Sequence, residues 1–389
     1  MSTIVTTAEN FAFGPTGRLL TVLKYLKKKH RLVFVGSGTA LQLASRDSFD
    51  KTYQLETSSK EFAEKATPIF RNVDLLVSSL DRPSVVLASD LGIPVVYIDG
   101  LFWRWEEVPK YLQNVECYIK QSSLLEDHVS LRNSQQIKNL HEVGPIVDPS
   151  PKLDPSRRNV VLVNLGGMEA SGLYEVGKDT NYPYIFTDIL IKMVNFSGYK
   201  EIIFTGNERI INQLRKMYPS KSVSKDVCKL KFKCLSHDDF LNQLANSSVI
   251  ITTPGGQTSL EAFTYQIPVI FLPPSNDTQY MWLDSFISEN CGLASIHLKE
   301  FFKPILFKNK NFRSTIQLLF NQIKKFESDD ILKKDVAHKI NSFLHNQPLL
   351  RKQLKAQSKY LKKLGGNGSY KTYQLIEKTI KKYQPRQLA

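Results

Sequence analysis

A glycine turn, two hydroxyl side chains and a carboxylate follow directly after an apolar run, Ser248 to Thr253, that is typical of a buried parallel strand. The residues of this motif are Thr253, Pro254, Gly255, Gly256, Gln257, Thr258, Ser259 and Glu261. Backbone amides at a helix start, helped by the positive end of the helix dipole, donate readily to phosphate oxygens. Glycine allows the backbone to approach such a ligand closely. The motif therefore predicts a site for a phosphorylated ligand.

The same stretch continues into a second strand and a polar loop. Ile267 to Leu272 is an apolar run next to prolines, and the loop after it leads to Asp277 and Gln279. Strand, glycine turn, helix start, strand and polar loop form a pattern that holds nucleotides at the carboxyl edge of a parallel sheet. The alternative is a plain packing element in which Glu261 is solvated.

The elements that must position this motif alternate between strand-like and helix-like segments. In the first 150 residues, strands are predicted over Arg31 to Val35, Val73 to Ser78 and Val95 to Ile98, and apolar residues recur at helical spacing over Leu19 to Lys29. Alternation with short loops predicts an α/β fold with a doubly wound parallel sheet. The pattern restarts with a strand at Val160.

The chain is long enough for two domains, since it has 389 residues. Four prolines between Gly144 and Asn159 mark the best boundary. We therefore predict an N-terminal Rossmann-like domain over residues 1–147, a linker over 148–158, a second Rossmann-like domain over 159–330 and a basic helical segment over 331–389. Ligands of such a pair of domains are expected to bind in the cleft across which they face each other.

The motif resembles the donor-binding signature of GT-B glycosyltransferases. The residues that carry this resemblance are Thr253 to Gly256, Thr258, Glu261, Ala262, Pro268, Pro273 and Gln279. The most similar branch includes the UDP-N-acetylglucosamine transferases of peptidoglycan synthesis. A looser resemblance, to cytosylglucuronic acid synthases, rests on FGPTGRLLTVL, VGSGTAL, YIDGLFWRW and VNLGG.

The resemblance implies roles for the residues of the second half. A UDP-sugar would be the donor, with Glu261 accepting hydrogen bonds from both of its ribose hydroxyls in a bidentate manner. Asp277 and Gln279 would hydrogen-bond the hydroxyls of the sugar. Gly166 and Gly167, which end the strand from Val160, fall where the family keeps a glycine turn. The reaction is expected to need no metal and to invert the anomeric carbon.

The first half is expected to bind the acceptor, through Thr16, Gly17, Trp103 and Trp105. Arg18 stands where the peptidoglycan enzymes have a histidine. Histidine can act as a base near neutral pH, whereas arginine stays protonated and can hold a phosphate or a carboxylate with two hydrogen bonds. Arg18 therefore favours a uronic acid in the donor, and a surface arginine is the alternative. The two tryptophans could stack on a nucleobase or a sugar, or pack in a core or an interface.

A base must take the proton of the acceptor. Asp99, Asp81 and Glu106 lie in loops that follow predicted strands of the first half. We select Asp99 as the catalytic base. The alternative is an aspartate that only caps its loop.

Charge is concentrated at the C-terminus. Residues 331–389 hold 14 Lys and Arg against two acidic residues, so they contribute most of the net charge of +15. This segment suggests a solvated face, or a peripheral contact with an anionic membrane, with nucleic acid a less favoured partner. The sequence shows no apolar run long enough to span a membrane and no secretory signal, so a cytoplasmic location is expected.

Metal ligands and disulfides are not expected. No Asp-x-Asp pair occurs, and Cys228, Cys234 and His237 lack an evident fourth ligand for zinc. Four unrelated cysteines in a long chain indicate reduced thiols. No cofactor is expected beyond the UDP-sugar co-substrate.

Two other functions stay open from the residues alone. One is a UDP-sugar 2-epimerase, which has a related fold and the same nucleotide site. The other is a non-enzymatic binder of nucleic acid or anionic membrane through the basic C-terminus. The leading hypothesis is a glycosyltransferase that moves a sugar from a UDP-sugar to a small-molecule or nucleobase-type acceptor.

Overall fold

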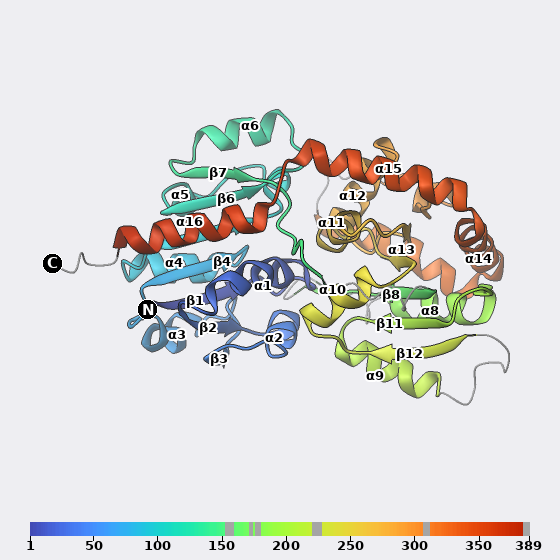
Figure 1. Ribbon diagram of the computed structural model, residues 1–389, viewed down its shortest axis with the longest axis horizontal. Helices are drawn as coiled ribbons and strands as arrows, with labels where there is room; N and C mark the ends of the chain where they lie inside the picture. Colours follow the sequence, from blue (N-terminus) through green and yellow to red (C-terminus); the bar gives the residue numbers. More distant parts are fainter. Residues whose placement is uncertain (152–158, 171–173, 176–179, 220–227, 306–311, 384–389) are drawn as a thin grey trace. The chain divides into compact units, whose positions relative to one another are not determined.

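A computed structural model describes residues 1–151, 159–170, 174–175, 180–219, 228–305 and 312–383. The chain divides into two compact units (Figure 1). Unit 1 comprises Met1–Asp148 and Lys362–Ala389, and unit 2 comprises Pro149–Leu361. The first crossing lies at the start of the predicted linker, of which residues 152–158 fall outside the described residues.

Unit 1 is built on a seven-stranded parallel sheet of order β3-β2-β1-β4-β5-β6-β7. Its strands are β1 (Thr3–Ala8), β2 (Arg31–Gly36), β3 (Lys51–Gln54), β4 (Leu75–Ser79), β5 (Val95–Asp99), β6 (Cys117–Gln121) and β7 (Leu140–Val143). The order reverses between β1 and β4, and ligands of doubly wound sheets bind at such a point, outside the carboxyl ends of the strands.

Helices cover both faces of this sheet, and an apolar core lies under each layer. They are α1 (Gly14–Leu26), α2 (Gly38–Ala44), α3 (Phe62–Phe70), α4 (Arg82–Asp90), α5 (Lys110–Gln113), α6 (His128–Gln135) and α16 (Gly368–Tyr383), with a 3-10 turn at Phe102–Arg104. The last helix of the chain, α16, packs against α1 and β6. The two ends of the chain therefore share one core.

Unit 2 contains a five-stranded parallel sheet of order β12-β11-β8-β13-β14. The strands are β8 (Val160–Asn164), β11 (Glu201–Thr205), β12 (Lys229–Lys233), β13 (Val249–Thr252) and β14 (Val269–Phe271), and an antiparallel pair joins β9 (Glu169–Ala170) to β10 (Tyr174–Glu175). The predicted pair of doubly wound α/β units is confirmed.

The helices of unit 2 include the three that follow β12, β13 and β14. These are α10 (His237–Ala245), α11 (Gly256–Thr264) and α12 (Asp277–Ser288). The others are α8 (Tyr182–Met193), α9 (Glu208–Met217), α13 (Phe312–Ser328), α14 (Asp330–His345) and α15 (Gln347–Leu364), with a 3-10 turn at Leu298–Glu300. Strands β8 and β13 are neighbours, so the turns that follow them meet at one edge.

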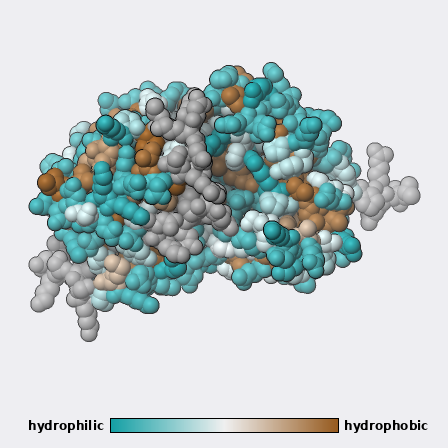
Figure 2. All heavy atoms as spheres, turned by 180° about the vertical axis from the view of Figure 1, so that it is seen from behind, coloured by the Kyte–Doolittle hydropathy of each residue, from teal (hydrophilic) through white to brown (hydrophobic). Residues whose placement is uncertain are grey.

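The structure divides the basic C-terminal residues between the two units. Gln353 of α15 accepts from the amide of Ala294 (2.7 Å) and donates to the carbonyl of Val269 (2.6 Å), both in unit 2. The chain then returns to unit 1 as α16. Figure 2 shows hydrophilic residues over most of the face it draws, with apolar residues in small patches. Within the described ranges, no helix has the length and apolar character needed to cross a membrane.

Candidate functional site

The predicted glycine turn connects β13 to α11, as the motif required. Gly255 occupies the N-cap position of α11, and no side chain caps this helix start. A side-chain β-carbon at Gly255 would meet nothing within 4 Å. At Gly256, by contrast, it would lie 2.8 Å from Cε2 of Trp282. Gly255 thus leaves open space beside the helix start, while Gly256 is required by packing inside the protein.

This difference predicts that alanine substitutions at the two glycines lower the stability of the protein by different amounts. Gly256→Ala should lower the free energy of unfolding by about 1–3 kcal/mol, because the new methyl group overlaps the buried Trp282 ring. Gly255→Ala is the matched control and should cost at most about 1 kcal/mol, the difference between glycine and alanine at an N-cap, because its methyl group meets no other atom. Urea unfolding of both variants measures the difference. Equal destabilisation would contradict the packing argument.

Asn164 connects the two glycine turns of unit 2, and the sequence analysis missed it. It is the last residue of β8, and its Oδ1 accepts from the amide of Gly166 at 3.1 Å. Its Nδ2 donates to Oγ1 of Thr258 at 3.3 Å. Gly166 has φ +69°, a conformation that favours glycine. The available signal was a polar residue ending the apolar run VVLVN.

Asn207, in the turn after β11, makes hydrogen bonds to both Gly166 and Gly167. The amide of Asn207 donates to the carbonyl of Gly166 at 2.9 Å, and its Nδ2 donates to the carbonyl of Gly167 at 3.2 Å. Gly166, Gly167 and Thr258 are therefore brought to one edge of the sheet.

Glu261 lies on the buried side of α11 and is only 2% exposed. Its Oε1 accepts from Nε2 of Gln257 at 2.9 Å and lies 3.4 Å from Nε2 of His237. The alternative of a solvated Glu261 is wrong. His237 begins α10, so two helices converge on this carboxylate.

Gln279 ties the polar loop to the glycine turn. Its Oε1 accepts from the amide of Ser275 at 2.8 Å and from Oγ of Ser275 at 2.9 Å, while its Nε2 donates to Oγ1 of Thr253 at 3.3 Å. Asp277 begins α12 beside it and is 4% exposed. Contact of Asp277 or Gln279 with a sugar stays a prediction, as does contact of Ser259, whose Oγ donates to the carbonyl of Gly255 at 2.7 Å.

Asp99 anchors its own loop in unit 1. The carboxylate is fully buried and accepts from the amide of Leu101 (2.7 Å), Nε1 of Trp105 (2.7 Å) and the hydroxyl of Tyr118 (2.6 Å). Burial raises the pKa of Asp99 although these hydrogen bonds oppose the shift. This geometry fits the loop-capping alternative, because a base that meets the acceptor needs an accessible oxygen.

Arg18 is buried and not on the surface, so the surface alternative is wrong. It is 4% exposed, and its Nε donates to Oε1 of Gln121 at 3.2 Å. A β-carbon at Gly100 would lie 2.2 Å from its guanidinium carbon, so Gly100 makes room for this side chain. Arg18 is held within the unit that contains the first Rossmann-like sheet.

The other residues predicted to bind the acceptor have different exposures. Thr16 and Gly17 are buried in the first turn of α1, and Oγ1 of Thr16 makes no hydrogen bond with any described residue. Trp103 is 6% exposed and belongs to the core. Trp105 is half-buried, with the guanidinium of Arg82 4.1 Å from its ring centroid. Of the two tryptophans, Trp105 is the more exposed residue.

Glu9 is a carboxylate that the sequence analysis missed. It follows β1 directly, at the carboxyl edge where the strand order reverses. Burial, Asp81 and Glu56 raise the pKa of Glu9 to about 7, and Arg82 opposes them. In the part of the chain that the structure describes, its carboxylate makes no hydrogen bond. Its position as the first acidic residue after the first strand was the available signal.

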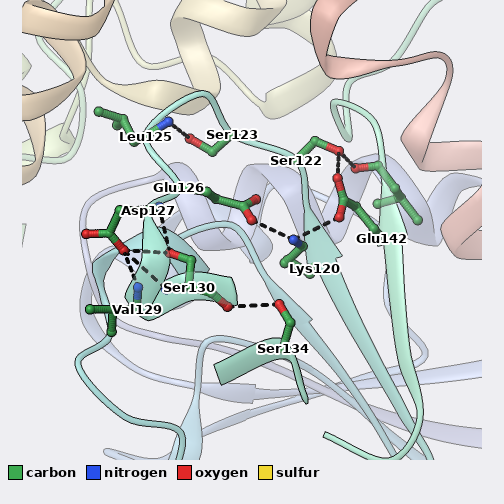
Figure 3. Close-up of polar contacts among 11 residues, drawn as sticks. Lys120, Ser122, Ser123, Leu125, Glu126, Asp127, Val129, Ser130, Ser134 and Glu142 are labelled. Atoms are coloured by element: carbon green, nitrogen blue, oxygen red, sulfur yellow. Dashed lines mark hydrogen bonds and ion pairs between the residues drawn. The ribbon is translucent and has the colours of Figure 1, made fainter. Parts of the chain in front are cut away.

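A buried lysine lies between two carboxylates at the neighbouring part of this edge (Figure 3). Nζ of Lys120 is 2.6 Å from Oε2 of Glu126 and 2.8 Å from Oε2 of Glu142. Oγ of Ser122 donates to the other oxygen of Glu142 at 3.0 Å. These contacts raise the pKa of Lys120 against the effect of burial. Lys120 therefore joins β6, β7 and the loop after β6, and its charge is already balanced.

The described ranges contain no group of three or more His, Cys, Asp or Glu side chains arranged to hold a metal ion. Cys228, Cys234 and His237 do not form such a group, and His237 faces Glu261 instead. The four cysteines are free thiols.

Solved structures with the same fold cover nearly the whole chain. MurG of Acinetobacter baumannii matches with a TM-score of 0.51 at 13% identity, over 97% of this chain and 100% of its own. UGT73P12 of Glycyrrhiza uralensis, solved with glycyrrhetinic acid 3-O-monoglucuronide, matches with a TM-score of 0.53 at 12% identity, over 99% and 96%. A UDP-glucosyltransferase from Polygonum tinctorium capable of glucosylating indoxyl matches with a TM-score of 0.52 at 13% identity, over 99% of each chain.

Neither the protein-family models nor the curated proteins searched match this chain. Identities of 12–13% with solved structures establish the fold alone. The chain has the GT-B fold, as the donor-binding signature indicated.

Proposed function

We propose that the protein is a glycosyltransferase that takes its sugar from a UDP-sugar. The observation that carries this proposal is the uncapped start of α11, with open space at Gly255 and the buried carboxylate of Glu261 one turn further along. An uncapped helix start offers amides and a positive dipole to a diphosphate. The fold shared with a UDP-glucosyltransferase supports the same assignment.

The same elements would stabilise the leaving group. As the bond from the anomeric carbon to the diphosphate breaks, negative charge grows on the phosphate oxygen. Amides at the start of α11 and the hydroxyl of Thr258, which Asn164 orients, would donate to these oxygens. Neither role needs a metal ion, and a single displacement of UDP by the acceptor would invert the anomeric carbon.

The donor sugar and the acceptor are less constrained. A uronic acid was favoured because of Arg18, but this guanidinium packs against Gly100 and Gln121 and supplies no argument for an acidic sugar over a neutral one. We place the small-molecule or nucleobase-type acceptor on unit 1, where Trp105 is the more exposed of the two predicted tryptophans.

Among the carboxylates of unit 1, Glu9 supports a role as the base better than Asp99 does. Glu9 is partly exposed and free of hydrogen bonds to the described residues, whereas Asp99 is buried and accepts three. A pKa of about 7 is suited to proton transfer at neutral pH. In this assignment, the proton of an acceptor hydroxyl passes to Glu9 as its oxygen bonds to the anomeric carbon and UDP leaves.

A thermal-shift screen of UDP-, GDP- and dTDP-sugars tests the proposal. UDP-glucose, UDP-N-acetylglucosamine and UDP-glucuronic acid cover neutral, acylated and acidic donors. A ligand present at about 100 times its Kd stabilises the native state by about 2.7 kcal/mol, which raises the Tm by several degrees. We expect UDP-sugars to give this shift. Absence of a shift with every nucleotide sugar would refute the proposed function.

A further inference from the structure

The buried carboxylate of Glu261 has two oxygens in different surroundings. Oε1 has two protein neighbours, Nε2 of Gln257 at 2.9 Å and Nε2 of His237 at 3.4 Å. No described residue makes a hydrogen bond to Oε2. One oxygen is therefore held by the protein, while the other keeps its capacity to accept hydrogen bonds.

The neighbours of Oε1 come from two helices and are themselves buried. Gln257 lies one turn before Glu261 on α11 and is 7% exposed. His237 begins α10 and is 5% exposed. The terminal torsion of a glutamate side chain is soft, so a carboxylate without such contacts would sample many orientations. Contacts from two directions fix the plane of the Glu261 carboxylate.

The histidine is not explained by stability alone. Its Nδ1 is buried and makes no hydrogen bond with any described residue. A buried polar atom without a partner destabilises the folded state, because it loses its hydrogen bonds to water and gains none in the protein. An apolar ring of the same size would avoid that cost, so the contact of Nε2 with Glu261 is the distinctive property of a histidine at this position.

We propose that His237 and Gln257 are positioning residues that hold Oε1 of Glu261 and so direct Oε2 towards a ribose hydroxyl of the bound nucleoside diphosphate. The inference rests on the proposed function, since it assumes that this site binds a UDP-sugar. In this proposal Oε1 contacts the protein and Oε2 contacts the ribose, whereas the sequence resemblance implied that the carboxylate contacts only ribose hydroxyls. His237 then acts on the nucleotide only through Glu261.

Calorimetric titration with UDP, 2′-deoxy-UDP and 3′-deoxy-UDP tests this division. Removing the contacted hydroxyl should weaken binding to the wild-type protein about 10-fold or more, the usual effect of one hydrogen bond to a charged group. In His237→Phe, UDP should bind about 10-fold more weakly, while the nucleotide lacking that hydroxyl binds nearly as before. The penalty for removing the hydroxyl should therefore largely disappear.

A conservative variant and a folding control complete the experiment. His237→Gln keeps an N–H donor near the place of Nε2 and should restore most of the ribose discrimination. The Tm of each variant without ligand shows whether it folds. If His237→Phe does not fold, Gln257→Leu takes its place, because it removes the other contact with Oε1 and should lower the ribose discrimination in the same way. In a folded variant that lacks a contact with Oε1, equal weakening of all three nucleotides or unchanged ribose discrimination would overturn the inference. If the wild-type protein binds no UDP at all, the proposed function has failed instead.

Discussion

Replacing Glu261 with glutamine should raise the Kd for UDP about 10- to 100-fold. Glutamine keeps the size of the side chain but removes the negative charge, so the ribose hydroxyl that donates to Oε2 loses a hydrogen bond to a charged acceptor, worth about 1.5–3 kcal/mol. Burial enlarges the effect, since Glu261 is 2% exposed and water cannot replace the lost partner. Isothermal titration with UDP measures the change directly.

Glu327→Gln is the control for this experiment. Glu327 is an exposed carboxylate of α13 in the same unit, and its Oε1 accepts from Nδ2 of Asn181 at 2.9 Å. The control should leave the affinity for UDP unchanged, because surface contacts of this kind contribute little. A Glu261→Gln protein that binds UDP within twofold of the wild type would remove Glu261 from the nucleotide site.

Strands with a continuous apolar run could be predicted from the sequence, whereas polar strands at the sheet edges could not. Runs such as Val95 to Ile98 are apolar on both faces, which is typical of buried parallel strands. Strand β3 reads KTYQ and is largely exposed at the edge of its sheet, so it carries no apolar run. Strand β12 reads KLKFK at an edge of the other sheet, and its alternating lysines leave it no continuous apolar run. Edge strands are specified by their pairing partners more than by their own composition.

The path of the C-terminal helices also escaped prediction. Apolar residues of α16 recur at helical spacing, and Ile376 and Ile380 join the core of unit 1. Periodicity reveals that such a stripe must be buried but does not identify the surface that buries it. Its partner is α1, from the opposite end of the chain. The helix was therefore predictable, and its location was not.

The residues of the candidate site also differ in whether their positions could be predicted from neighbouring sequence or depend on contacts between distant segments. The turn from Thr253 to Gly256 and the carboxylate of Glu261 are contiguous, so their arrangement follows from one strand, one turn and one helix. Asn164 and His237 reach this turn only through the folded sheet. For Asp99 and Arg18, the residue type was informative, but burial decides what they can do, and burial depends on distant residues.

Glu9→Gln should make the protein more stable above pH 7 and should slow the proposed transfer of sugar from UDP to the acceptor. The pKa of Glu9 is about 7 in the folded protein against an ordinary value of 4.5, so the folded state favours the neutral acid. Wild-type stability from this group is complete below pH 4.5 and is lost as the pH rises through 7. Glutamine stays neutral, so we expect the variant to match the wild type near pH 4 and to exceed it at pH 8 by about 1–3 kcal/mol.

Loss of function is the second part of this prediction. Glutamine cannot take a proton from an acceptor, so the rate of UDP release from a bound UDP-sugar should fall about 10²- to 10⁴-fold. Water serves as the acceptor in this assay. Glu56→Gln is the contrasting variant, because hydroxyls of Ser37 (2.7 Å) and Ser58 (2.8 Å) donate to its carboxylate and their loss should lower stability. A Glu9→Gln protein with a lower Tm at pH 8 would identify Glu9 as a structural carboxylate. A gain in stability together with loss of UDP release would instead show that the partly buried charge of Glu9 destabilises the fold but is needed for the reaction.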